Sequence, residues 1–307
     1  MISISHKSKQ FLVLLIKILI VVAAFYFIYN QLANNDKLDW KKIIVIFKKN
    51  QSITGIIFIL FLSFLNRFLE ILKWQNLVLV IHKISIAEAS KQVLASLTLG
   101  IFTPNGIGEY AGKALYFDKN QTSKIVFLNL ICNGIQLILT IVLGAVGLLI
   151  LGYWFWVLII LLIGFGLLLL GFFTQKIKIK GYSIDQFIAK IQEIPKKIHQ
   201  KNIILGIARY ITFSHQSYFL YVAFGVQIPY SILMATIITV YLLASSLPSF
   251  QFLDFAVKGS VAVYFFSILG VNEWIVVFVT TLMWFLNVVI PVILGSFYVI
   301  KFKSNWS

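Results

Sequence analysis

The 307-residue sequence has little of what a soluble enzyme usually needs: it has one cysteine, four histidines, ten acidic residues and no long polar segment. Because Cys132 stands alone, a disulfide within the chain and a cysteine cluster for a metal are both excluded. The histidines show no metal-ligand spacing, and the longest mostly polar segment, about 174–202, is too short for an independent soluble catalytic domain. Any chemistry must therefore take place in or at a membrane, and we expect no metal or other cofactor.

Apolar residues dominate what is present. The chain is 60% hydrophobic and 16% aromatic, 12% of its residues are charged, and its mean hydropathy is +0.94. These values are typical of an all-α polytopic integral membrane protein. The net charge of +16 comes mostly from lysines that flank apolar runs, which indicates membrane topology and gives no reason to expect a nucleic-acid partner.

Apolar runs long enough to cross a bilayer predict about six full spans. They cover about 11–29, 53–80, two spans within 124–173, then 203–224 and 273–300. We interpret residues 1–307 as one transmembrane domain. Its parts are an N-terminal anchor with an interfacial stretch (10–50), a first repeat (51–150), a linking span with a basic cytoplasmic loop (151–202) and a second repeat (203–300).

A polar stretch at 103–113 breaks this apolar pattern. Its helix-breaking residues are Pro104, Asn105, Gly106 and Gly108. A helix arriving along 86–102 must stop here, and a second one restarts at Glu109 and continues to about 117. Neither arm can cross a bilayer, so we predict a re-entrant helical hairpin whose break is buried in protein or lines a wet cavity. The alternative is one kinked helix with a helical tail on the surface.

The break recurs in the second half of the chain, within a second broken segment at about 230–266. The matching residues are Glu109 with Asp254, Lys113 with Lys258, Pro104 with Pro248, and the only two arginines, Arg67 with Arg209. These pairs lie 145, 145, 144 and 142 positions apart, which indicates an old internal duplication. Three full spans separate the two starts, so the repeats are inverted, an arrangement that typically places a binding site between two broken helices near the membrane midplane.

The lysine distribution predicts the orientation in the membrane. With six spans and two re-entrant hairpins, sixteen lysines near span ends fall on the face that holds both termini, and five fall on the other face. The lysine-rich face should be cytoplasmic. We therefore expect a multi-pass protein of a bacterial inner (plasma) membrane with both termini in the cytoplasm.

Ionisable and amide residues inside apolar helices are the candidates for a binding site, because such groups usually face a partner or a wet path. Arg67 and Glu70 lie in the second span, and Asn133 and Gln136 belong to a polar stripe. The predicted substrate-binding residues are Arg67, Glu70, Pro104, Asn105, Gly106, Gly108, Glu109, Lys113, Asn133, Gln136, Arg209, Asp254 and Lys258.

Structural alternatives stand beside this interpretation. Each acid–lysine pair has the spacing of a local ion pair that stabilises a restarted helix, and amide stripes also hold helices together. Lys73 has the position of a side chain that snorkels to the interface.

Three motifs resemble the transmembrane region of the lysylphosphatidylglycerol synthase family, over about residues 10–300. They are the helix with Arg67, Glu70, Lys73 and Trp74, the Pro-x-x-x-Gly-Glu pattern ending at Glu109, and the run from Leu242 to Pro248. The resemblance implies a flippase-like protein that moves a polar lipid between leaflets. The aminoacyl transferase domain that some members carry does not occur in this sequence, so the resemblance does not imply synthesis of an aminoacylated lipid.

Our leading hypothesis is translocation of a polar or anionic lipid, either a phospholipid or an isoprenoid lipid. A membrane-embedded lipid-modifying enzyme is the second hypothesis, with His215 and Asp254 as the groups available for acid–base chemistry. The third is a non-catalytic partner subunit of a lipid or glycan synthase.

Overall fold

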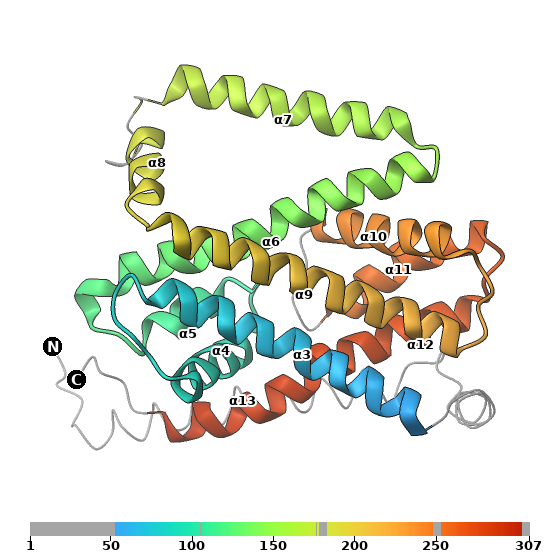
Figure 1. The fold of residues 1–307 in the computed structure, drawn as a ribbon, viewed down its shortest axis with the longest axis horizontal. Coiled ribbons are helices and arrows are strands. Elements are labelled where there is room, and N and C mark those ends of the chain that lie inside the picture. The colour runs from blue at the N-terminus through green and yellow to red at the C-terminus, as the bar shows by residue number, and fades with distance from the viewer. Residues whose placement is uncertain (1–52, 105, 176, 178–182, 248–252, 303–307) are drawn as a thin grey trace, which may run out of the picture.

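The computed structural model describes residues 53–104, 106–175, 177, 183–247 and 253–302, and every regular element in these ranges is helical (Figure 1). The first half contains α3 (Ile53–Val78), α4 (Ile86–Gly100), α5 (Gly108–Ala114), the short helix η1 (Lys119–Gln121), α6 (Thr122–Ile150), α7 (Trp154–Thr174) and α8 (Ile184–Gln192). The second half contains α9 (Lys196–Ala223), α10 (Tyr230–Ser246), α11 (Asp254–Ile268), α12 (Glu273–Trp284), the π-helical segment η3 (Phe285–Val289) and α13 (Ile290–Lys301).

Four helical stretches in the described ranges are long and apolar enough to span a membrane, which confirms the prediction of an all-α membrane protein. They are Ile53–Val78, Lys119–Ile150, Trp154–Thr174 and Glu273–Lys301. The span predicted at 203–224 lies within α9, which has 28 residues but a larger share of polar side chains than these four. The span predicted at 11–29 and the interfacial stretch to residue 50 lie outside the described residues.

Both predicted breaks separate pairs of packed helices. Helix α4 has 15 residues and α5 has seven, so neither reaches the roughly 20 residues that a full crossing needs. Helices α10 and α11, of 17 and 15 residues, lie on either side of the second predicted break, whose Pro248 is outside the described residues. Figure 1 shows the α4–α5 pair toward one end of the molecule and the α10–α11 pair toward the other, with α3 and α9 running in opposite directions between them. This arrangement agrees with the predicted inverted repeat.

The two halves pack crosswise. Helix α13 of the second half contacts α4, and α6 of the first half contacts α10. Both contacts are close because a glycine removes the side chain: a Cβ on Gly147 would overlap the Ala235 carbonyl and the Thr239 hydroxyl, and one on Gly295 would overlap the Leu94 carbonyl and the Thr98 hydroxyl. A carbonyl and a threonine four residues later form both contacts, so the packing itself repeats.

Helix α7 contacts little besides the adjoining α6. Its apolar surface is almost entirely exposed, and Val157 is its only buried residue. An outward apolar surface of this kind is what a lipid-facing span requires. Figure 1 shows α7 at the edge of the molecule, joined through α8 to the start of α9.

Candidate functional site

The first break is held by Thr103. Its hydroxyl donates to the Gly100 carbonyl at 2.6 Å, at the end of α4, and accepts from the Gly108 N–H at 2.8 Å, at the start of α5. Gly106 has φ 69°, a conformation that residues with a side chain rarely adopt. A Cβ on Gly108 would lie 2.8 Å from the Leu99 carbonyl oxygen, so only glycine allows the two arms to approach this closely.

A pocket of about 540 Å³, here called the central pocket, lies between the two halves. Eight predicted site residues line it: Arg67, Glu70, Glu109, Asn133, Gln136, Arg209, Asp254 and Lys258. They come from α3, α5 and α6 in the first half and from α9 and α11 in the second. Within one helix these residues are three or four positions apart, whereas residues of different helices are far apart in sequence and are brought together by the fold.

Glu70 is the centre of the ionic cluster in the wall of this pocket. Its carboxylate lies 3.0 Å from Nη1 of Arg209 and 4.0 Å from Nζ of Lys73, and its side chain is 7% exposed. Lys73 is fully buried and donates to the Cys132 carbonyl at 3.2 Å and to Gln136 Oε1 at 3.4 Å. Lys73 therefore points into the protein and does not snorkel to the interface, and the cluster ties α3 to α6 and α9.

Each arginine reaches an amide residue in the other half. Arg67 donates to the Asn287 carbonyl at 2.5 Å, and Arg209 donates to Gln136 Oε1 at 3.3 Å. Asn287 lies in η3, and the π-helical turn that contains it interrupts an otherwise α-helical span, a feature often found at functional sites. Its side chain accepts from Asn66 at 2.6 Å and donates to Gln216 at 3.0 Å, which fixes the turn against α3 and α9.

Several donors in the pocket wall have no acceptor within the described part of the chain. They are Arg67 Nε, Arg209 Nε and Gln136 Nε2, and all three atoms are buried. A buried donor without an acceptor costs about 1–3 kcal/mol, and more when it is charged. Two acceptor oxygens in the same wall, Asn66 Oδ1 and Glu70 Oε2, also lack a hydrogen-bond donor in the described residues, although Glu70 Oε2 is ion-paired with Arg209. Donors therefore outnumber acceptors among these groups, which favours a ligand that supplies acceptor atoms.

The second half contributes a more exposed ion pair. Lys258 donates to Asp254 at 2.5 Å, with side chains 35% and 26% exposed. The ammonium of Lys258 lies 5.7 Å from the ring centroid of Tyr241, whose hydroxyl is 2.5 Å from the Ser217 hydroxyl. The local ion pair weighed as a structural alternative thus forms in the second half, at the pocket wall.

Four other predicted site residues do not line the central pocket. Pro104, Gly106 and Gly108 shape the break between α4 and α5, and Asn105 lies outside the described residues. Lys113 is fully buried, where it donates to Asn129 at 2.6 Å and lies 4.6 Å from the centroid of the Trp74 ring. Pro104, Gly106, Gly108 and Lys113 thus position the site and do not form its wall.

Sequence reasoning missed several residues of the pocket wall. They include Tyr110, Ser217, Tyr241 and Asn287. Tyr110 lies inside the helix-breaking stretch and its hydroxyl accepts from Asn133 at 3.2 Å, so its position offered a signal. Asn287 could also have been recognised from the sequence, because it is a polar residue in an apolar span. Ser217 and Tyr241 could not, because they resemble ordinary packing residues.

His215 stands apart from this site. Its Nε2 is 2.9 Å from the Tyr230 hydroxyl, and it does not line the central pocket, whereas Asp254 does. The two groups considered for acid–base chemistry are therefore not gathered in one pocket.

Comparison of the chain with protein-family models, curated proteins and solved structures gives no match. The resemblance to the lysylphosphatidylglycerol synthase transmembrane region thus stays a prediction, and the arguments below rest on the residues and geometry of this chain.

Proposed function

We propose that the protein moves a phosphate-bearing polar lipid between the two leaflets of its membrane, with the lipid headgroup held in the central pocket. A charged headgroup cannot enter hydrocarbon without a polar path that replaces its water. The observation that carries the proposal is the set of buried donors on Arg67, Arg209 and Gln136 that have no acceptor in the described residues. A phosphate has no donors when ionised and several acceptor oxygens, so it is complementary to this set.

The charge of the region favours the same class of ligand. The charged side chains that line the central pocket balance, with Arg67, Arg209 and Lys258 against Glu70, Glu109 and Asp254. Two further cations, Lys73 and Lys113, are buried near this wall, so the region as a whole has two more positive than negative groups. Uncompensated charge inside a membrane protein is costly, and an anionic headgroup would reduce that cost.

The pocket also lies where a translocator needs it. Its wall combines residues of both halves, including Glu109 of the α4–α5 pair and Lys258 of the α10–α11 pair. These two helix pairs lie toward opposite ends of the molecule (Figure 1). Inverted repeats with broken helices characteristically place their substrate site at such a junction. A bacterial inner membrane, cytoplasmic termini and a phospholipid or isoprenoid lipid as the substrate complete the proposal.

The test is leaflet exchange in proteoliposomes that contain this protein alone. Fluorescent phospholipids with different headgroups are compared with a fluorescent lipid that lacks phosphate, and we expect protein-dependent exchange only of the former. Arg67→Lys keeps the charge but removes the Nε donor, and a hydrogen bond to a charged group contributes about 1.5–3 kcal/mol, so exchange should fall roughly 10- to 100-fold.

Two further variants separate the site from general surface charge. Glu109→Gln should abolish exchange with normal protein abundance, whereas Lys201→Gln, an exposed position two turns before Arg209 on α9, should leave exchange unchanged. Absence of exchange for every lipid, in a folded and reconstituted protein, would refute the translocator proposal. Equal exchange of the phosphate-free lipid would refute the phosphate specificity.

A further inference from the structure

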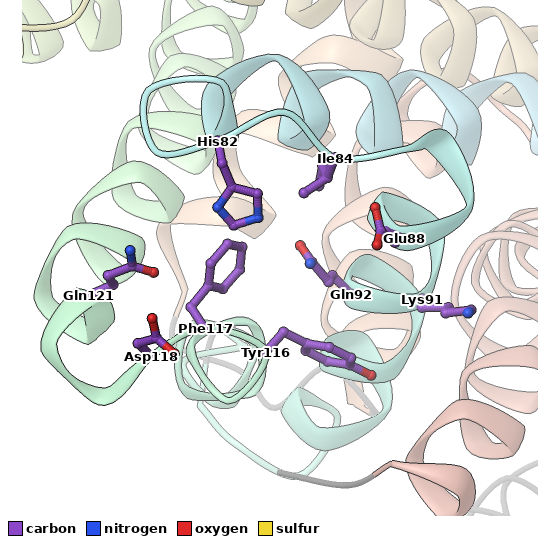
Figure 2. A pocket seen from close by; sticks show the side chains of 9 residues that line it. All are labelled: His82, Ile84, Glu88, Lys91, Gln92, Tyr116, Phe117, Asp118 and Gln121. Carbon is purple, nitrogen blue, oxygen red and sulfur yellow. The ribbon is translucent and has the colours of Figure 1, made fainter. Parts of the chain in front are cut away.

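A second pocket, here called the outer pocket, has a volume of about 380 Å³ and lies beside the loop that joins α3 to α4. Figure 2 shows its lining side chains around one space, with the amide end of Gln92 directed toward the Phe117 ring. These residues are His82, Ile84, Glu88, Lys91, Gln92, Tyr116, Phe117, Asp118 and Gln121. None of them lines the central pocket.

The outer pocket offers polar groups held in fixed orientations. Gln92 is 6% exposed, and its Oε1 accepts from the Trp74 indole at 2.7 Å, which orients its NH₂ group. The backbone N–H and the hydroxyl of Ser85 donate to Glu88, and these bonds hold the pKa of its carboxyl below the usual value. Burial raises the pKa of the Tyr116 hydroxyl to about 12.

Trp74 packs directly behind the wall of this pocket, where its indole donates to Gln92. Trp74 is fully buried, and its ring meets the Phe117 ring edge to face at a centroid distance of 6.5 Å. The Lys113 ammonium, 4.6 Å from the Trp74 ring centroid, donates to Asn129. Asn129 lies one helical turn before Asn133 in the wall of the central pocket, so the side chains of Trp74, Lys113 and Asn129 follow one another between the two pockets.

The two pockets occupy successive depths along the same hairpin. On α4, Gln92 lines the outer pocket and Leu97 lines the central one, and five residues of helix correspond to a rise of about 7.5 Å. On the other arm, Tyr110 lines the central pocket and Tyr116, just beyond α5, lines the outer one. The hairpin therefore runs from one pocket to the other past Trp74.

We propose that the outer pocket is a second headgroup subsite on the same path as the central pocket, and that Trp74 with Lys113 is the partition that closes the path between them. This inference rests on the proposed function, because it assigns the outer pocket to the same polar lipid headgroup. On the predicted topology, the outer pocket is where the headgroup enters or leaves on the lysine-rich face. Trp74 acts by excluding water and headgroup, and Gln92 positions it.

The protein carries its own reporter for the partition. Cys132 is the only cysteine, is fully buried and packs in the same apolar cluster as Trp74 and Phe117. In proteoliposomes, a membrane-impermeant maleimide should label it very slowly. Trp74→Ala should raise the labelling rate at least tenfold, because removal of the ring joins the cluster to the outer pocket.

Two variants keep this test decisive. Trp74→Phe retains an aromatic ring and should label nearly as slowly as the native protein, whereas Trp156→Ala removes an exposed tryptophan of α7 and should change nothing. Circular dichroism establishes that each variant is folded. Unchanged Cys132 labelling in a folded Trp74→Ala variant would overturn the partition, and equal labelling of Trp74→Phe and Trp74→Ala would show that the ring is not the barrier.

The subsite itself is tested with Gln121→Cys in a Cys132→Ala background. Short-chain phosphatidylglycerol and phosphatidylcholine should slow labelling at position 121 several-fold, and an uncharged detergent at the same concentration should not. If neither lipid protects the position while leaflet exchange is normal, the outer subsite is refuted and the proposed function stands. If exchange is absent and labelling still follows the expected pattern, the proposed function fails and the partition remains.

Discussion

Neutralising Glu70 should lower the free energy of unfolding far more than neutralising a carboxylate in an exposed ion pair. Its carboxylate is the buried partner of Arg209 at 3.0 Å and of Lys73 at 4.0 Å. Glu70→Gln keeps the side-chain size but leaves two cations without their carboxylate, and breaking a buried pair in this way costs about 3–5 kcal/mol. The Arg209 side chain is 20% exposed, so we expect a loss of about 3 kcal/mol in the free energy of unfolding.

Asp254→Asn is the matched control, because it makes the same chemical change in a more exposed pair. The side chains of Asp254 and Lys258 are 26% and 35% exposed. Pairs open to solvent contribute about 0–1 kcal/mol. The difference in burial therefore predicts that Glu70→Gln loses about 2–3 kcal/mol more free energy of unfolding than Asp254→Asn.

The assay is reversible unfolding in mixed micelles, in which the SDS fraction is raised and helix content is followed by circular dichroism. The double variant Glu70→Gln/Arg209→Gln should lose less stability than the sum of its single variants, because it removes the unpaired arginine as well as the carboxylate. A cost below 1 kcal/mol for Glu70→Gln, or strictly additive costs, would refute the reasoning.

Two further predictions concern the packing that positions the site. Gly147→Ala and Gly295→Ala should each lower the free energy of unfolding by about 1–3 kcal/mol in the same assay, since the added carbon overlaps a backbone carbonyl of the facing helix. Gly166→Ala in α7 is the control, because its added carbon meets open space. Equal losses at all three positions would contradict the close contacts. Thr103→Val should lower the free energy of unfolding by about 1 kcal/mol and slow leaflet exchange, because it removes both hydrogen bonds that hold the break. Thr103→Ser should retain both bonds. Wild-type exchange and stability in Thr103→Val would show that the break does not depend on this residue.

Much of the fold could be predicted from the sequence, because lipid imposes strong constraints on backbone and composition. Apolar length located α3, α6 and α7, and the aromatic cluster after Gly152 marked the division between α6 and α7, where Gly152 has φ 82°. Pro104 and the glycines that follow it located the break after α4. The prediction was less complete for the last span, since no local pattern announces the π-helical turn at Asn287.

The candidate site was only partly predictable. Ionisable residues in apolar helices are costly and therefore rare, so Arg67 and Glu70 could be recognised as site candidates from the sequence. Their partners depend on how helices pack: four-residue spacing suggests that Lys113 pairs with Glu109, yet its ammonium bonds Asn129 and lies over Trp74. Spacing within one helix therefore shows which residues share a face and leaves open which neighbour that face meets.

The crossed contacts show why the pocket belongs to neither half alone. Arg67 depends on the Asn287 carbonyl of the second half, and Arg209 depends on Gln136 of the first. A relative movement of the halves would change both contacts, because each of them joins a residue of one half to a residue of the other. The guanidinium groups that we propose to hold the headgroup are thus the same groups that join the two halves. Binding of an anion and rearrangement of the halves would therefore act on one set of hydrogen bonds.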